Sequence, residues 1–395
     1  MPGNIRISTV VLLVMVVAGH AVASEEAAES PEKVPQKDHL GIELSSEDER
    51  FSVNAWLRGQ FRFSDPFDAD PLVVDDFADP PGSDFEVRRA RLKVEGHVFS
   101  PRIGFYYEHE LTGERPLLDL RLDLEINDNL SLRVGQYKVL YNRERVDSSG
   151  KQQFAERSIA TYAFTLDRQR GVTVEGSHAN SVFTVGVFEG DGRDPDARGD
   201  DPMLVGRWQW NFLGEPLGFS QSDHGMRAVP AASLSVGAAR VRGPYTRYSS
   251  SGGGQLDGFT QGDDDRYTLR QWMQEFAWQY AGWSVQQEFH VKEIEDHVSA
   301  VESTLRGGYL QFGKAWEAGW TPFSSIPEVA LRVARVDWDA ARPDRTQDEL
   351  TLAGNLFFDG HDNKLTADVS RVELGEETGA SDQDVRFRLQ WDVSF

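Results

Sequence analysis

Basic residues recur at alternate positions of this chain, and their spacing decides what chemistry they could perform. The stretch RRARLK places Arg89, Arg91 and Lys93 two residues apart. In a β-strand this spacing puts all three side chains on one face of the sheet. Guanidinium groups bind oxyanions with a fixed fork of donors, so a series of them lets an anion step between sites. Alternation of side chains along each predicted strand places a larger set of basic residues on the same face of the sheet. These residues are Arg58, Arg62, Arg89, Arg91, Lys93, Arg121, Arg133, Arg207, Lys292, Arg332, Arg386 and Arg388.

Acidic residues share that face, so a second interpretation stays open. In it, the arginines form structural cross-strand ion pairs and bind no solute. The acids that would serve as partners are Glu95, Asp119, Asp123, Glu125 and Glu288. We expect individual arginines to be divided between these two roles and the set as a whole to favour anions.

The sequence carries no pattern of a catalytic or metal site. It has no cysteine, which excludes disulfides, thiolate ligands and cysteine nucleophiles. The nine histidines show no ligand spacing, and His97 and His109 lack a neighbour with which to form a catalytic pair. The acidic run GDGRDPDARGDD resembles a calcium loop only loosely, and a solvated loop is the simpler interpretation. A net charge of -23 argues against a nucleic-acid partner. We expect no enzyme, no metal and no cofactor.

The elements that carry the basic residues are predicted to be β-strands. Apolar and polar residues alternate strictly over about ten residues, which indicates strands and not helices. In the final stretch, VRFRLQWDVSF, the apolar residues occupy every second position. About sixteen such segments can be counted. They begin near Phe51, Phe85, Ile103, Leu117, Leu130, Gly171, Val182, Met203, Ala232, Leu269, Trp283, Leu305, Val329, Leu350, Leu365 and Val385.

Strand length and loop pattern together predict an all-β, transmembrane antiparallel β-barrel of 16 strands. Strands of about ten residues match a bilayer crossed at a tilt. Tight joints such as residues 178–180 and 281–282 alternate with long polar loops, as in outer-membrane barrels. In such a barrel the apolar face meets lipid and the polar face lines water. Phe387, Leu389 and Trp391 are therefore expected to face lipid.

The N-terminal region divides into two predicted segments before the barrel. An apolar core at Val10–Ala18, followed by AVA at Ala21–Ala23, predicts a signal peptide over 1–23. Residues 24–50 are acidic and free of aromatic residues up to the Phe51 boundary, so we expect a flexible segment. Residues 51–395 form the predicted barrel domain in the bacterial outer membrane. The outward acidic loops, at Asp75–Asp84, Asp191–Asp201 and Asp263–Asp265, are expected to share divalent cations with lipopolysaccharide.

Residues 133–176 resemble the phosphate-selective porin O and P family. The matching motifs are GQYK at Gly135–Lys138, RxR–SS at Arg143–Ser149, AERS at Ala155–Ser158, AF at Ala163–Phe164 and R–RGV at Arg168–Val172. Upstream, VRRARLKVEG at Val87–Gly96 matches the second strand of the family, and GVFEGDG at Gly186–Gly192 matches the seventh.

The resemblance implies a trimeric porin whose third loop, here residues 139–167, folds into the lumen as a constriction. It implies passive diffusion of small anions such as phosphate, with selectivity set by pore diameter and charged rings. The alternative is a general or carbohydrate-selective diffusion porin without phosphate preference. A sugar pore would show a slide of aromatic residues, and only Trp56, Tyr106 and Tyr309 face inward by parity.

The resemblance also assigns roles to residues of the constriction. Arg88 and Arg89 match arginines beside the narrowest point, and Ser148 and Ser149 match serines that hydrogen-bond the anion. Leu140 and Asn142 replace a common proline and glycine, and Arg143 and Arg145 stand where lysines are more usual. The predicted anion pathway is Arg88, Arg89, Arg91, Lys93, Arg121, Arg133, Lys138, Arg143, Arg145, Ser148, Ser149 and Lys151.

The last residue, Phe395, is expected to act in assembly. A C-terminal strand that ends in phenylalanine resembles the sorting signal read by the bacterial barrel-assembly machinery. The expected partners are therefore this machinery, outer-membrane lipid, small phosphate-like anions and further copies of the chain in a homotrimer.

Overall fold

The structure is a computed structural model that describes residues 41–72, 74–78, 80–113, 116–193, 201–249, 252–260, 265–318, 324–338, 346–375 and 381–395. The predicted signal peptide and residues 24–40 lie outside the described residues. Parts of the three acidic loops, including 194–200 and 261–264, also lie outside them.

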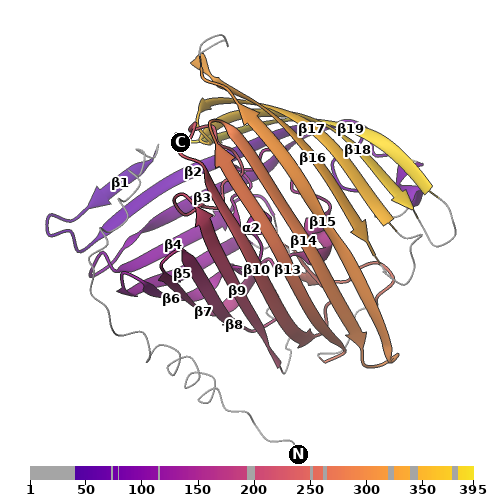
Figure 1. Cartoon of the computed structure of the whole chain (residues 1–395), viewed down its shortest axis with the longest axis horizontal. Coiled ribbons are helices and arrows are strands. Elements are labelled where there is room, and N and C mark those ends of the chain that lie inside the picture. Colours follow the sequence, from indigo (N-terminus) through magenta and orange to yellow (C-terminus); the bar gives the residue numbers. More distant parts are fainter. Residues whose placement is uncertain are drawn as a thin grey trace, which may run out of the picture. The chain divides into compact units, whose positions relative to one another are not determined.

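Sixteen antiparallel strands form one closed sheet in which each strand pairs with its neighbour along the chain (Figure 1). The barrel closes where β19 pairs with β2, from Phe387 opposite Asp65 to Ser394 opposite Arg58. The predicted fold class is confirmed, and each predicted starting point falls within or next to an observed strand. The strands are β2 (Ser52–Asp65), β3 (Asp84–His97), β4 (Ile103–Glu110), β5 (Leu117–Asn127), β6 (Leu130–Lys138), β7 (Arg168–His178), β8 (Ser181–Phe188), β9 (Asp201–Leu213), β10 (Ala231–Gly243), β13 (Tyr267–Tyr280), β14 (Trp283–Asp296), β15 (Val301–Ala315), β16 (Ile326–Asp337), β17 (Thr346–Asp359), β18 (Asn363–Gly375) and β19 (Ser381–Ser394).

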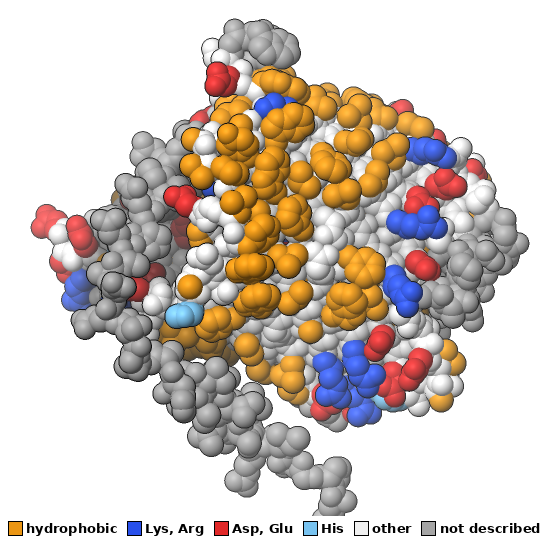
Figure 2. Space-filling model, viewed as in Figure 1, with side chains coloured by type: hydrophobic (Ala, Val, Ile, Leu, Met, Phe, Trp, Pro, Cys, Tyr) orange, Lys and Arg blue, Asp and Glu red, His pale blue; other side chains and the backbone are white. Residues whose placement is uncertain are grey.

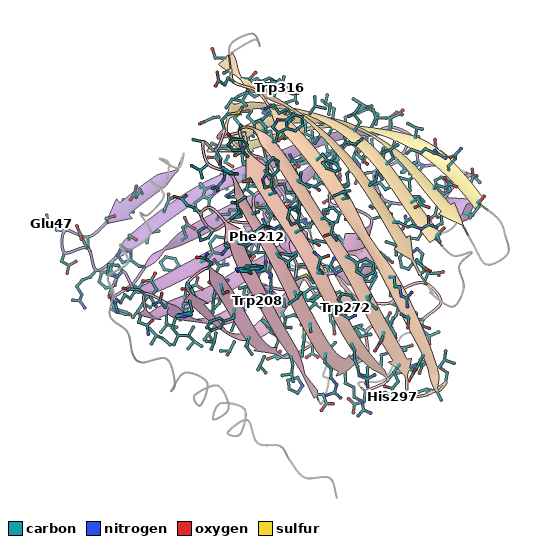
Figure 3. All side chains as sticks on the ribbon, in the orientation of Figure 1. Glu47, Trp208, Phe212, Trp272, His297 and Trp316 are labelled. Atoms are coloured by element: carbon teal, nitrogen blue, oxygen red, sulfur yellow. The ribbon has the colours of Figure 1, made fainter. Side chains whose placement is uncertain are left out.

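The two faces of the wall carry opposite kinds of side chain. In β19, Leu389 and Trp391 are 39% and 46% exposed, whereas Arg388 and Gln390 between them are 3% and 0% exposed. The outer face is covered by apolar side chains (Figure 2), among them Trp208 and Trp272 (Figure 3). A water-soluble protein would place its apolar face inward, so this arrangement identifies lipid as the outer solvent.

Connections differ between the two rims of the barrel. One rim has hairpin turns at residues 128–129, 179–180 and 281–282, whereas the opposite rim carries longer loops such as 139–167 and 244–266. In outer-membrane barrels the short turns face the periplasm and the long loops face outward. The loop 244–266 contains a small hairpin of β11 (Arg247–Ser249) and β12 (Gly252–Gly254).

A long connection on the periplasmic rim was not revealed by the sequence. Residues 214–230, which we call the inner turn, join β9 and β10. Leu217, Gln221 and Ser222 in this segment are 5%, 1% and 4% exposed, so the middle of the inner turn is buried although both of its ends are exposed. Its glycine, proline and serine content is that of any polar loop, and composition does not reveal the side of the membrane.

A further strand, β1 (Ile42–Ser45), lies within the segment predicted to be flexible. It pairs with β2, from Ile42 opposite Ala55 to Ser45 opposite Ser52. Phe395, next to β19, exchanges backbone hydrogen bonds of 2.8 and 2.9 Å with Leu57. The start of β2 extends past this point and would otherwise present unpaired backbone groups. β1 covers that exposed edge.

The helical segments are short. They are the 3-10 helix η1 (Val74–Phe77) and the helices α2 (Arg143–Val146) and α3 (Ala160–Phe164). None of the described helices is long and apolar enough to cross a membrane.

Candidate functional site

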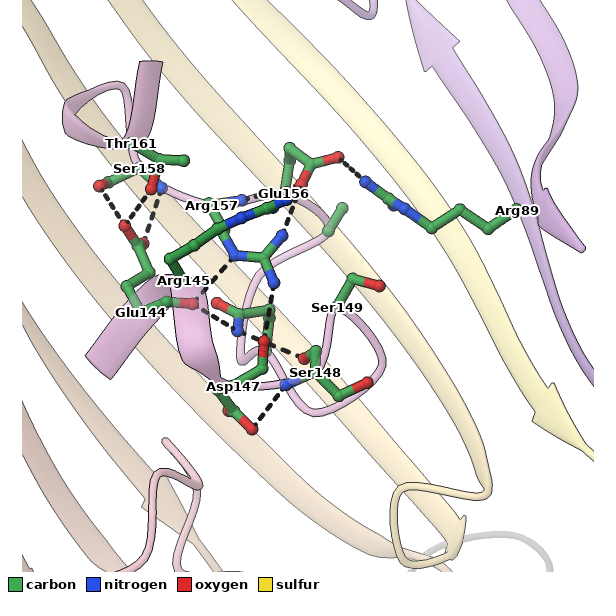
Figure 4. Close-up of polar contacts among 12 residues, drawn as sticks. Arg89, Glu144, Arg145, Asp147, Ser148, Ser149, Glu156, Arg157, Ser158 and Thr161 are labelled. Atoms are coloured by element: carbon green, nitrogen blue, oxygen red, sulfur yellow. Dashed lines mark hydrogen bonds and ion pairs between the residues drawn. The ribbon is translucent and has the colours of Figure 1, made fainter. Parts of the chain in front are cut away.

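Residues 139–167, the constriction loop, join β6 to β7 and lie inside the barrel, as predicted. The loop contains α2 and α3 and is largely buried: Tyr141, Phe154 and Phe164 are each 0% exposed. Glu144 holds the loop in shape, because its carboxylate accepts hydrogen bonds from Ser158 N at 2.8 Å and Thr161 Oγ1 at 2.7 Å (Figure 4). The constriction is therefore a folded element with its own internal contacts.

The constriction loop is fixed to the wall formed by β13 to β17. Glu288 on β14 accepts hydrogen bonds from Asn142 Nδ2 at 2.9 Å and from Glu144 N at 2.6 Å. The backbone N–H of Arg143 donates to Glu275 on β13 at 3.0 Å. The backbone N–H of Ile159 donates to Glu349 on β17 at 3.1 Å. These buried contacts leave little space between the loop and this wall.

The inner turn fills the same half of the lumen from the periplasmic side. Gln221 accepts a hydrogen bond of 2.9 Å from Gln153 N and donates one of 2.7 Å to Gln152 Oε1. Ser222 Oγ donates to Glu328 on β16 at 2.6 Å, and Gln153 Nε2 donates to the same carboxylate at 2.8 Å. Two segments from opposite rims therefore meet inside the barrel and share partners.

Next to β5 and β6, inward side chains are partly exposed to water. The inward side chains of Arg121, Asp123 and Arg133 are 25%, 30% and 26% exposed. On the opposite wall, the inward Lys292 and Lys364 are both 0% exposed.

Arg88 and Arg89 are brought together by a β-bulge, although neighbouring strand residues normally point to opposite faces. The register shifts there, because Gln60 pairs with Arg89 and Phe61 pairs with Val87. Both arginines approach Glu156 of the constriction loop, Arg89 at 2.9 Å (Figure 4) and Arg88 at 3.6 Å. Alternation in the sequence does not reveal such a shift.

Carboxylates from loops neutralise the arginines around this point. Asp68 in the loop after β2 pairs with Arg62 at 2.9 Å and Arg388 at 3.3 Å. Burial opposes ionisation of Glu156, but Arg89, Arg62 and Arg88 outweigh it and hold the pKa of this carboxyl well below its usual range. The arginines around this point therefore form structural ion pairs, and their partners Asp68 and Glu156 come from loops and not from neighbouring strands.

The other predicted arginines are also paired. Arg91 forms ion pairs with Glu108 at 2.8 Å and Glu110 at 2.7 Å. Arg121 and Arg133 share Asp123. Within the constriction loop, Arg145 pairs with Asp167, and Arg143 approaches Glu275 at 3.8 Å.

Three predicted lysines differ from the arginines. Within the described residues, Lys93, Lys138 and Lys151 form no ion pair with a carboxylate. Lys138 Nζ donates to the carbonyls of Val146 and Asp147 at 3.2 and 3.0 Å. Lys93 lies 5.9 Å from the centre of the Trp56 ring, and Lys151 is exposed.

The predicted serines, Ser148 and Ser149, lie close to Lys151 in the sequence. Ser149 Oγ accepts a hydrogen bond of 2.9 Å from Arg58, which pairs with Asp392 at 2.7 Å. Burial raises the pKa of Asp147, and the nearby charges of Lys151 and Lys138 act against this rise.

Comparison with known proteins places the chain in a family. The family model described as phosphate-selective porin O and P matches residues 67–392. The chain belongs to this family. The comparison with curated proteins found no match.

Solved porins have the same fold. The anion-selective porin from Comamonas acidovorans has a TM-score of 0.56 at 10% identity, covering 87% of this chain and 100% of that one. The outer-membrane channel DcaP of Acinetobacter baumannii has a TM-score of 0.56 at 12% identity, covering 89% and 99%. A loop L8 deletion mutant of OmpT from Vibrio cholerae has a TM-score of 0.55 at 9% identity, covering 88% and 100%.

Sequence reasoning missed several basic residues of this porin's lumen, among them Arg157 and Lys364. Arg157, inside the AERS motif, donates to the carbonyls of Glu144 and Asp147 at 2.9 and 2.8 Å. Lys364 on β18 donates to the carbonyl of Gln152 at 2.6 Å. Period-two parity could have found Lys364, whereas no strand pattern extends into the constriction loop.

Proposed function

We propose that this outer-membrane porin is a water-filled channel for small anions, with phosphate-like oxyanions as its preferred solutes. The observation that carries the proposal is the contrast between paired arginines and unpaired lysines. Lys93, Lys138 and Lys151 carry positive charge that no carboxylate of the described residues offsets within ion-pairing distance. Such charges in a low-dielectric pore concentrate anions.

The paired arginines support the proposal in a second way. Glu156 and Asp68 neutralise the cluster of Arg62, Arg88 and Arg89, so that region does not retain an anion tightly. Conduction requires binding that is favourable enough for entry and weak enough for release. Lysine binds as a mobile point charge, and it suits such transient contacts.

Ion selectivity of single variants tests the proposal. We expect Lys138→Gln and Lys151→Gln each to shift the reversal potential in a potassium chloride gradient toward cations, and the double variant to shift it further. Phosphate should block chloride current in the wild-type channel at lower concentration than in the double variant. Lys314→Gln is the control, because Lys314 lies at the end of β15 and donates to the carbonyl of Ala281 at 2.7 Å.

An unchanged reversal potential in the double variant would contradict the proposal. A wild-type channel without ion preference would instead favour the general diffusion porin. We also predict that the porin forms a homotrimer, is recognised by the assembly machinery and contacts lipopolysaccharide.

A further inference from the structure

The outer face of the barrel changes from apolar to charged near the long-loop rim. On β15, the outward residues Leu310 and Phe312 are followed toward that rim by Arg306. On β16, the outward Val333 is followed by Arg335, which lies directly opposite Asp348 of β17. Figure 2 shows basic and acidic side chains gathered beyond the apolar part of the wall. Charged residues on a lipid face are tolerated near the interfaces of the membrane and not at its centre.

A groove opens at this boundary on the outer face. It has a volume of about 620 Å³ and lies over Gly308, an outward position of β15 that has no side chain. Its apolar floor and charged margin come from five neighbouring strands, β14 to β18. The floor includes Phe289, Leu310, Val333 and Leu350, and the margin includes Arg306, Arg335, Asp348, Arg371 and Glu373.

The charged groups at the margin remain available to a ligand. Arg335 is 65% exposed and pairs with Asp348 at 3.6 Å, and Arg371 is 54% exposed and pairs with Glu373 at 3.0 Å. Arg306 is exposed and forms no ion pair with any carboxylate that the structure describes. Exposed ion pairs contribute little stability, so a ligand can replace them at little cost.

We propose that this groove binds the phosphorylated glycolipid of the outer leaflet, lipopolysaccharide. One acyl chain lies against Phe289, Val333 and Leu350. Arg306, Arg335 and Arg371 bind a phosphate group of the sugar head, because guanidinium groups match phosphate geometry. The carboxylates at the margin accept hydrogen bonds from sugar hydroxyls. Free phosphate does not fit this role, since the arginines stand directly above an apolar floor that faces the membrane.

The placement of the groove supports this occupant. It lies toward the rim of the long loops, opposite the rim that holds Phe395, and that rim faces away from the periplasm. This orientation of the barrel places the groove in the outer leaflet of the outer membrane. The inference is independent of the proposed anion preference, because every residue of the margin points away from the lumen.

The test is lipid binding by the purified, full-length porin. The probe is bisphosphorylated lipid A in detergent. Native mass spectrometry measures the number of lipid A molecules bound to the porin. We expect wild type to retain it and the triple variant Arg306→Gln, Arg335→Gln and Arg371→Gln to bind at least tenfold more weakly. Dephosphorylated lipid A should bind wild type as weakly as the triple variant binds the probe. Inorganic phosphate at millimolar concentration should not displace the probe.

Two further variants keep the result interpretable. Val333→Trp fills the floor and leaves all three arginines, so it should also weaken binding. Arg102→Gln, at an exposed arginine of the periplasmic turn 98–102, should bind like wild type. Equal binding by wild type and the triple variant would overturn the proposal, and so would equal loss in Arg102→Gln. Unchanged ion selectivity in the triple variant separates this test from that of the proposed function.

Discussion

At the scale of single residues, the chemistry of the lumen depends on which cations have a carboxylate partner. Parity along a strand identified the inward arginines correctly, as the buried Arg386 and Arg388 show. It identified the strand partner Asp123 but not the loop partners Asp68 and Glu156, because these loops approach the wall only after folding. The bulge that turns both Arg88 and Arg89 toward Glu156 is a local register shift, which alternating residue types do not encode.

Glu156 is the residue on which this balance depends, and Glu156→Gln tests its role. The change leaves Arg62, Arg88 and Arg89 with less compensating charge, so we expect the reversal potential to shift further toward anions. We also expect the free energy of unfolding to fall by about 3 kcal/mol, because one partner of a buried network is lost. Single-channel recording and thermal unfolding check the two effects. Glu302→Gln, at an exposed carboxylate, is the control.

The pKa of Glu156 adds a dependence on pH with a defined sign. Its folded pKa is lowered, so the stabilisation it provides is complete above the unfolded value of about 4.3 and is lost as pH falls below it. Wild type should therefore lose stability in acid more steeply than Glu156→Gln. Parallel acid denaturation curves for the two proteins would show that Glu156 is not the group responsible.

At the scale of elements, strands were predictable and the segments that enter the lumen were only partly so. Each strand follows from period-two alternation, which does not depend on distant contacts. The constriction loop was found through family motifs. The inner turn and β1 were missed because each is ordered by a partner far away in sequence: Glu328 for the inner turn and the uncovered edge of β2 for β1.

The inner turn should limit conductance. Leu213 and Ala232 already pair across β9 and β10, so a two-residue turn can replace residues 215–229 without disturbing the strands. We expect this variant to show higher single-channel conductance and more current noise, because the constriction loop loses the hydrogen bonds of Gln152 and Gln153 to Gln221. Ion preference should persist, since the three lysines remain. Unchanged conductance would mean that the inner turn lies outside the permeation path.

At the scale of the whole molecule, the closed sheet leaves the apolar face outward and the ionic network inward. This inversion was predictable because length, alternation and loop pattern are properties of the entire chain. The difference between the two walls of the lumen was not predictable from the sequence. The wall of β13 to β17 supports the constriction loop through contacts such as Asn142–Glu288, which join residues 146 positions apart and leave no pattern in the sequence.

The last prediction concerns how the molecule reaches its membrane. Phe395 closes the barrel through two backbone hydrogen bonds with Leu57, while its side chain is 59% exposed and faces outward. Phe395→Ala keeps both backbone bonds, so the refolded barrel should unfold at nearly the wild-type temperature. If the side chain acts as an assembly signal, the amount of this variant in the outer membrane should nevertheless fall severalfold. Phe387→Ala, at an outward phenylalanine within the same strand, is the control and should reach the membrane normally. Equal losses in yield and in thermal stability for Phe395→Ala would show that the residue acts only through packing.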